Sequence, residues 1–260
     1  MTTTDPYGDR ANAELYDLAW GEESGDLQMY EQFARRGESP SLELGVGTGR
    51  VALHLARQGL QVVGIDAAAP MLARLEGSLE HDAAQRIRLI EADMRDFDLA
   101  PQKFDLIYCA ANSFQHMLTT DDQLATLRCV ASHLAPGGVY VMQLRALRAI
   151  DWGLERTPLY LRWTHAIPGS ADRLMRFDST TIAAAAQTAT TTHFFDRVSP
   201  DGTVSRRIIE YTLRYTGLAE LRTLHDAAGL RATHVYGDTD LSPYDDGSDT
   251  MIVVAEAKES

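Results

Sequence analysis

The sequence predicts an α/β fold in which a seven-stranded, mostly parallel sheet has helices on both faces and carries an antiparallel hairpin after its fifth strand. From about residue 40 to 144, short runs rich in β-branched residues alternate with segments of helical period, which is typical of strands joined by crossover helices. Residues 174–196 and 203–216 are instead rich in Thr, Phe, Tyr and Ile, and a turn signal, Ser199-Pro-Asp-Gly202, separates them. These observations predict a core with an inserted hairpin.

The first half of the core follows from local signals taken in order. Residues 41–44 form a short strand that leads through glycines into a helix over Arg50–Gln58. A second strand covers residues 60–65, and Pro70 then opens a helix at a position where its missing N–H is not needed. The third strand covers residues 87–91.

The second half repeats the pattern. Residues 104–109 predict a buried strand, and Asp121 or Asp122 is expected to cap the next helix. Pro136-Gly137-Gly138 is expected to stop that helix, and residues 139–144 form the fifth strand.

The end of the chain supplies the remaining core elements. Residues 220–228, followed by Gly229, predict a last helix, and residues 232–236 and 251–255 predict the two closing strands.

Composition narrows the class of protein. The 260 residues are 45% apolar, which is enough to bury one large core with a smaller appended layer. A formal charge of -13 without a basic stripe argues against nucleic acid as a partner and favours a small-molecule substrate. No apolar run is long enough to span a bilayer and the N-terminus does not resemble a leader, so we expect a cytoplasmic protein without membrane contact. A homo-oligomer is one oligomeric state compatible with the sequence.

The two cysteines do not suggest a disulfide or a metal site. Cys109 and Cys129 fall inside apolar segments, which predicts buried, reduced thiols. No group of His, Cys or carboxylate residues has the spacing of metal ligands, so no metal is expected.

The segment from Leu42 to Arg50 is a strand, a glycine-rich turn and the start of a helix. Gly45, Gly47 and Gly49 allow a ligand to approach the backbone closely, next to the N–H groups at the helix start. A tight turn without a ligand is the structural alternative. A dinucleotide site is disfavoured because Arg50 stands where its last glycine would fall.

Two acidic residues follow the next two strands. Asp66 ends the second strand, where a carboxylate can accept the hydroxyl protons of a ribose, although it can also cap the following helix. Asp93 follows the third strand, where it can accept an adenine amino proton while Met94 packs on the ring. The pattern therefore indicates a nucleoside cofactor.

Over residues 40–144 the sequence resembles the class I S-adenosylmethionine-dependent methyltransferases, which have a Rossmann-like fold. The resemblance is carried by Glu43-Leu-Gly-Val-Gly-Thr-Gly49, Val63-Gly-Ile-Asp66, Ala69-Pro-Met-Leu72, Ala92-Asp-Met94, Phe104-Asp-Leu-Ile107 and Leu134-Ala-Pro-Gly-Gly138. It implies S-adenosylmethionine as the cofactor, bound by Tyr16, Glu43, Gly45, Gly47, Gly49, Asp66, Ala67, Met71, Asp93, Met94 and Ala110.

A narrower resemblance concerns the acceptor. The loop Ala110-Ala-Asn-Ser-Phe-Gln-His-Met117 is similar to that of glycine and sarcosine N-methyltransferases, and amino-sugar N-methyltransferases share the layout. It implies that Asn112, His116 and Arg145 bind the acceptor and that His116 and Tyr16 are catalytic. The segment 21–26 is acidic where the glycine enzymes carry a cofactor-binding arginine.

The resemblance also assigns roles to the segments. Residues 1–39, with Tyr7 and Tyr16, form a helical lid, and residues 40–144 form the cofactor-binding core. Residues 145–219 form a substrate-covering insertion, in which His165 and His193 are further candidates to face the acceptor. Residues 220–260 supply the last helix and closing strands.

The predicted function is transfer of a methyl group from S-adenosylmethionine to a small-molecule acceptor, with an amine nitrogen favoured. O- or C-methylation of a natural-product intermediate is an alternative within the same class. A non-catalytic S-adenosylmethionine-binding protein is the alternative from another class.

Overall fold

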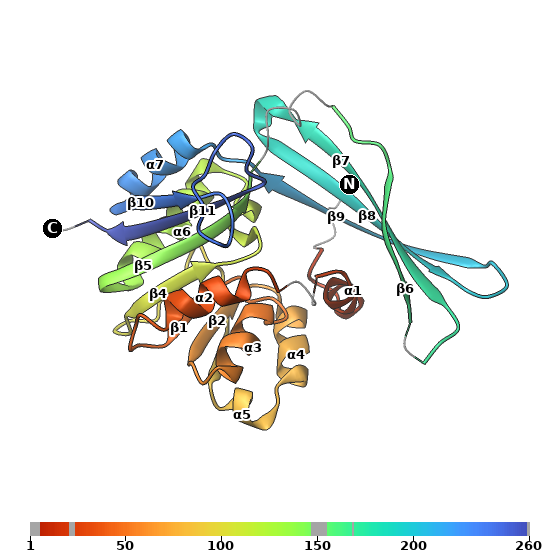
Figure 1. Ribbon diagram of the computed structural model, residues 1–260, viewed down its shortest axis with the longest axis horizontal. Coiled ribbons are helices and arrows are strands. Elements are labelled where there is room, and N and C mark those ends of the chain that lie inside the picture. Colours follow the sequence, from red (N-terminus) through yellow and green to blue (C-terminus); the bar gives the residue numbers. More distant parts are fainter. Residues whose placement is uncertain (1–5, 21–23, 147–154, 168, 259–260) are drawn as a thin grey trace. The chain divides into compact units, whose positions relative to one another are not determined.

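The computed structural model describes residues 6–20, 24–146, 155–167 and 169–258. The chain divides into two compact units. Unit 1 comprises Met1–Arg148 and Thr216–Ser260, and unit 2 comprises Ala149–Tyr215. Each unit contains its own sheet (Figure 1).

The sheet of unit 1 has seven strands in the order β10-β11-β5-β4-β1-β2-β3. Its strands are β1 Ser41–Leu44, β2 Val62–Asp66, β3 Ile87–Glu91, β4 Phe104–Cys109, β5 Leu134–Arg145, β10 Leu230–Tyr236 and β11 Thr250–Ala257. Strand β11 lies antiparallel between β5 and β10, whereas β1 to β5 pair in parallel (Figure 1). The predicted fold class is confirmed.

Helices cover both faces of this sheet (Figure 1). They are α1 Arg10–Trp20, α2 Leu27–Ala34, α3 Arg50–Arg57, α4 Ala69–Ser78, α5 His81–Ala84, the short 3₁₀ helix η1 Ser113–His116, α6 Thr120–His133 and α7 Leu218–Ala227. Alternation along β4 places Leu106 in the core with α2, α3 and α4, and Ile107 in the core with α6 and α7. No helix of the described segments has the length and apolar character needed to cross a bilayer.

Helix α6 begins earlier than predicted. Its N-cap is Thr119, whose Oγ1 accepts a hydrogen bond of 3.1 Å from the backbone N–H of Asp122. The expected cap at Asp121 or Asp122 is therefore wrong, because both carboxylates lie in the first turn, where they stabilise the helix by charge. Strand β5 also begins five residues earlier than predicted, at Leu134, which pairs with Phe104.

Unit 2 contains a four-stranded antiparallel sheet in the order β6-β7-β8-β9. Its strands are β6 Tyr160–Ala166, β7 Arg173–Ala183, β8 Thr188–Val198 and β9 Val204–Arg214. The turn at Ser199 joins β8 to β9 as predicted, with Gly202 N–H donating to the Ser199 carbonyl. The sheet has more strands than the predicted hairpin: residues 174–196 form parts of β7 and β8, because the chain reverses at Ala184–Gln187, with Gln187 at a φ of 53°.

The start of α3 depends on a glycine that no other residue can replace without cost. Gly49 has a φ of +84°, and a Cβ there would lie 2.3 Å from Cδ1 of the buried Leu75. Gly59, after the same helix, has a φ of +85° but no atom within 4 Å of such a Cβ. Both Gly→Ala variants carry the backbone strain, and only Gly49→Ala adds a clash.

We therefore expect Gly49→Ala to lower the free energy of unfolding by about 1 to 3 kcal/mol more than Gly59→Ala does. Urea unfolding of the two variants and of the wild type measures this difference. Equal losses for both variants would show that Leu75 moves aside without cost.

Candidate functional site

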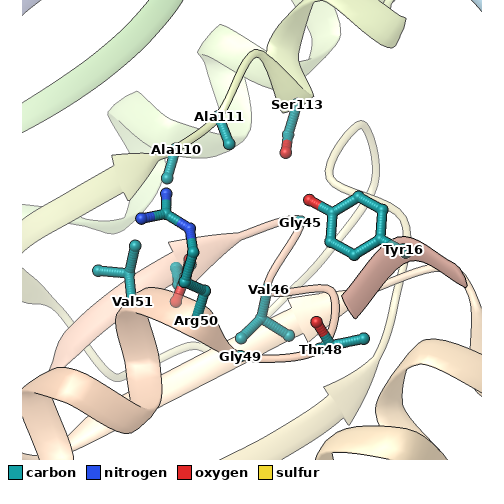
Figure 2. A pocket seen from close by; sticks show the side chains of 11 residues that line it. Tyr16, Gly45, Val46, Thr48, Gly49, Arg50, Val51, Ala110, Ala111 and Ser113 are labelled. Carbon is teal, nitrogen blue, oxygen red and sulfur yellow. The ribbon is translucent and has the colours of Figure 1, made fainter. Parts of the chain in front are cut away.

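A pocket lies at the carboxyl ends of the parallel strands, where β1 separates β2 from β4. The connections from β1 and from β3 run in opposite directions along the sheet, and such a switch point is the usual ligand site of open α/β sheets. The pocket is lined by Tyr16, Glu43, Gly45, Val46, Thr48, Gly49, Arg50, Val51, Ala110, Ala111 and Ser113. In Figure 2, Tyr16 and Arg50 flank the glycine-rich turn.

Some of the predicted cofactor residues line this pocket and others border it. The lining includes Tyr16, Glu43, Gly45, Gly49 and Ala110. The predicted residues outside the lining are Gly47, Asp66, Ala67, Met71, Asp93 and Met94.

Asp66 is bonded to the glycine-rich turn itself. Asp66 Oδ2 accepts a hydrogen bond of 2.8 Å from the Gly47 N–H, and its Oδ1 accepts one of 2.8 Å from the Ala68 N–H. Asp66 is not the N-cap of α4, which is Ala68, but its carboxylate accepts the backbone N–H groups of the turn and of that N-cap residue.

The glycine turn is held close to the loop after β4. Gly45 has a φ of +69°, and a Cβ there would lie 2.9 Å from Cβ of Ser113 and 3.3 Å from Cε of Met94. The Gly45 and Val46 N–H groups donate to the Ile65 carbonyl over 2.9 and 3.0 Å. A Cβ at Gly45 would therefore clash with Ser113 and crowd Met94, so this close approach of the turn to the loop requires glycine.

Glu43 places a buried carboxyl group in the pocket. It is 3% exposed, and the Tyr108 hydroxyl donates a hydrogen bond of 2.9 Å to its Oε2. Burial raises the pKa of Glu43 to about 8, although the bond from Tyr108 opposes this shift. Glu43 is therefore mostly neutral at pH 7, and a cationic ligand would favour its charged form.

This raised pKa makes stability depend on pH. In the unfolded chain Glu43 ionises near pH 4.5, so between pH 4.5 and 8 the folded protein binds more protons and its stability falls as pH rises. Replacing Glu43 with Gln removes this contribution. Between pH 6 and 8.5 the variant should gain on the order of 2 kcal/mol relative to wild type. Urea unfolding at both pH values measures this, and a pH-independent difference would contradict the assignment.

Arg50 is a pocket residue that sequence reasoning did not include. Its guanidinium forms a bidentate ion pair with Asp26, in which Nη2 donates to Oδ2 over 2.7 Å and Nη1 donates to Oδ1. Asp26 belongs to the acidic segment 21–26, of which residues 21–23 lie outside the described part of the chain. Asp26 thus fixes the guanidinium of Arg50, the residue that directly follows the glycine-rich turn.

Asp93 is held by a neighbour that the sequence did not suggest. The Arg95 Nη2 donates to its Oδ2 over 2.6 Å, and the Arg95 backbone N–H donates to its Oδ1 over 2.8 Å. The side-chain bond from Arg95 lowers the pKa of Asp93. Arg95 also pairs with Asp122 of α6. Asp93 is therefore a fixed, ionised acceptor beside Met94.

The loop after β4 carries the predicted acceptor residue Asn112 in an unusual backbone conformation. Ala111 and Asn112 have φ values of 49° and 69°, which non-glycine residues adopt rarely. Gln143 of β5 holds them, because its backbone carbonyl accepts the Asn112 N–H and its side chain accepts the Ala111 N–H. The Tyr30 hydroxyl donates to the same side-chain oxygen over 3.0 Å.

His116 ends the loop helix η1 and contacts the N-terminal segment. Its Nε2 lies 3.1 Å from the Tyr7 hydroxyl, and the Tyr7 ring meets the Tyr16 ring edge to face at 6.1 Å between centroids. Tyr7 was predicted as part of the lid but not as a site residue. Arg145, at the end of β5, has an exposed side chain. The structure thus brings His116 into contact with Tyr7, which in turn packs against Tyr16.

The two histidines of the insertion have different surroundings within unit 2. His193 on β8 is 1% exposed, and its Nδ1 hydrogen-bonds the Asp178 carboxylate of β7. Burial lowers the pKa of His193 despite this bond. Arg176 also donates to Asp178, over 2.8 to 2.9 Å. His165 on β6 is exposed.

Comparison with known proteins agrees with this geometry. A family described as a methyltransferase domain matches residues 42–138. The cypemycin N-terminal methyltransferase of a Streptomyces species is 29% identical over 218 residues, covering 83% of this chain and 82% of the relative.

Two further relatives match about half of each chain. The dTDP-4-amino-2,3,4,6-tetradeoxy-D-glucose N,N-dimethyltransferase of Saccharopolyspora spinosa is 28% identical, over 51% of this chain and 53% of its own length. The glycine/sarcosine N-methyltransferase of Halorhodospira halochloris is 29% identical, over 52% and 51%. Both kinds of N-methyltransferase inferred from the sequence are thus among the relatives.

A solved structure extends the likeness to the whole chain. The CcbJ methyltransferase from Streptomyces caelestis superposes with a TM-score of 0.78 at 27% identity, covering 97% of this chain and 98% of that one. The matched domain, the relatives and the fold together identify the chain as an S-adenosylmethionine-dependent methyltransferase with a Rossmann-like core.

Proposed function

We propose that this methyltransferase transfers the methyl group to an amine nitrogen of a small-molecule acceptor. The observation that carries the proposal is His116, which lies 3.1 Å from the Tyr7 hydroxyl beside the pocket residue Tyr16. A base at this place suits an acceptor that must lose a proton. The N-methyltransferases among the relatives support the same choice.

The cofactor side uses the residues around the glycine turn. Gly45 and Gly49 border the methionine portion, with the buried carboxyl of Glu43 beside them. Asp66 accepts hydrogen bonds from the ribose hydroxyls, and Asp93 accepts a hydrogen bond from the adenine amino group. The cofactor supplies an activated methyl group, so the protein needs no covalent intermediate of its own.

The acceptor side uses the loop after β4 and the end of β5. An amine attacks only when neutral, and His116 takes its proton directly or through a water. Asn112 donates or accepts a hydrogen bond to the acceptor, and Arg145 pairs with an acceptor carboxylate or other anionic group. Tyr16 and the lid exclude water from the reacting atoms.

A screen with paired acceptors tests the proposal. Purified protein and methyl-deuterated cofactor are incubated with glycine, sarcosine, a short peptide with a free N-terminal amine, and glucosamine, and the products are weighed by mass spectrometry. Glycolate and glucose serve as hydroxyl partners of two of these amines. We expect transfer to at least one amine and little to its hydroxyl partner. Preferred methylation of glycolate or glucose would overturn the amine assignment.

A further inference from the structure

Gln115 is a buried residue between two of the proposed acceptor residues, and neither the sequence nor the pocket points to it. It lies in η1, directly before His116, and is 2% exposed. Its side-chain Nε2 donates to the Arg145 carbonyl over 3.2 Å, and its Oε1 accepts the Arg145 N–H over 3.0 Å. One amide group thus pairs with both backbone groups of Arg145.

This pairing takes the place of a missing strand neighbour. Strand β4 ends at Cys109, which pairs with Met142 of β5, so β5 continues three residues beyond its last partner on that side. On the other side, Arg145 faces Thr250 of β11. The Gln115 amide forms the hydrogen bonds to the Arg145 backbone that a further residue of β4 would otherwise form.

The pairing also joins two segments that are distant in sequence. Arg145 is exposed at its side chain but fixed at its backbone, and the fixing residue precedes His116 by one position. A buried amide bonded twice leaves little freedom for the loop to shift against β5. The distance between the backbone of His116 and that of Arg145 therefore depends on Gln115.

We propose that Gln115 is a positioning residue that fixes the backbone of Arg145 relative to that of His116. An acceptor bound by the Arg145 guanidinium is then held within reach of the His116 imidazole. This inference rests on the proposed function, since it needs both residues to face the acceptor. Gln115 is not among the residues that line the pocket, so its role is to position other groups. Small displacements of such groups lower rates strongly, because transfer requires alignment of the reacting atoms.

The chain offers a matched control in Gln123 of α6. It is also a fully buried amide with two partners, and its Nε2 donates to the Met117 carbonyl over 3.1 Å and to Thr216 Oγ1 over 2.9 Å. It makes no bond to Arg145. Gln123→Leu should therefore lower stability to a similar extent without separating His116 from Arg145.

The test uses the amine from the panel above that gives the highest kcat/KM. Gln115→Leu should raise the KM for this amine about tenfold and leave the Kd for S-adenosylmethionine within about twofold of wild type. Gln115→Glu should restore most of the loss at pH 6, because a buried neutral carboxyl can donate and accept as the amide does. Gln123→Leu should change KM by less than about twofold.

A double-mutant cycle separates positioning from general destabilisation. If Gln115 acts through Arg145, Arg145→Ala raises KM much less in the Gln115→Leu background than in the wild type. Additive effects would overturn the positioning role, as would an unchanged KM for Gln115→Leu where Arg145→Ala raises it. An unchanged KM for Arg145→Ala alone would instead remove Arg145 from the proposed function, and the positioning role with it.

Hydrogen exchange tests the pairing of Gln115 with the Arg145 backbone directly and needs no acceptor. The Arg145 amide should exchange with deuterium at least about tenfold faster in Gln115→Leu and at the wild-type rate in Gln123→Leu. Unchanged exchange in Gln115→Leu would overturn the inference whether or not any amine of the panel is methylated.

Discussion

Replacing His116 with alanine is expected to lower kcat about 100-fold or more, because a positioned general base typically contributes that much to a proton transfer. The Kd for S-adenosylmethionine should stay close to the wild-type value, since His116 does not line the cofactor pocket. Single-turnover kinetics with saturating amine, together with calorimetry of the cofactor, measures both quantities.

Two further variants serve as comparisons for the expected loss of kcat in His116→Ala. Tyr7→Phe keeps the ring but removes the hydroxyl that lies 3.1 Å from His116 Nε2, so kcat should fall by a smaller factor, about tenfold. His81→Ala changes an exposed histidine of α5 and should leave kcat unchanged. Turnover at the wild-type rate by His116→Ala would remove this histidine from the reaction.

Replacing Asp66 with alanine is expected to weaken cofactor binding about 100-fold, or about 3 kcal/mol, since it removes a charged acceptor of two ribose hydroxyls. The same change removes the acceptor of the Gly47 and Ala68 N–H groups, so the glycine-rich turn is less ordered in the cofactor-free protein. Both effects act in the same direction, and calorimetry measures their sum as a change in Kd.

Asp105 provides the control for the structural part of this effect. Its carboxylate also accepts two backbone N–H groups, from Glu38 and Ser39 over 2.9 and 2.8 Å, but it does not line the pocket. Asp105→Ala should therefore lower stability and leave the cofactor Kd nearly unchanged. Wild-type cofactor affinity in Asp66→Ala would exclude the ribose contact.

The fold was predictable because its signals are local. The period change near residue 145 and the turn at Ser199 each lie within a few residues, and they predicted the core and an antiparallel insertion. Strand β6 was missed. The reversal at Gln187 was also missed, because a positive φ at a glutamine has no sequence signal. The cap of α6 was misplaced because Thr119, Asp121 and Asp122 are all good cap residues.

The site was predictable only where the motif itself is continuous. The glycine turn and Glu43 lie within seven residues and line the pocket. The contacts between Tyr7 and His116 and between Asp26 and Arg50 join residues 109 and 24 positions apart, so no local pattern announces them. The roles of Asn112 and Arg145, and the substrate-covering role of residues 145–219, stay predictions.

The position of β11 also has a consequence for how the chain is made. This strand is the last of the sheet to be synthesised, yet it pairs along its length with both β5 and β10. While the ribosome still holds residues 250–257, β5 and β10 each present an open hydrogen-bonding edge, and open edges favour pairing with other chains. A stalled or truncated nascent chain that lacks β11 is therefore the form of this protein most prone to aggregate before release.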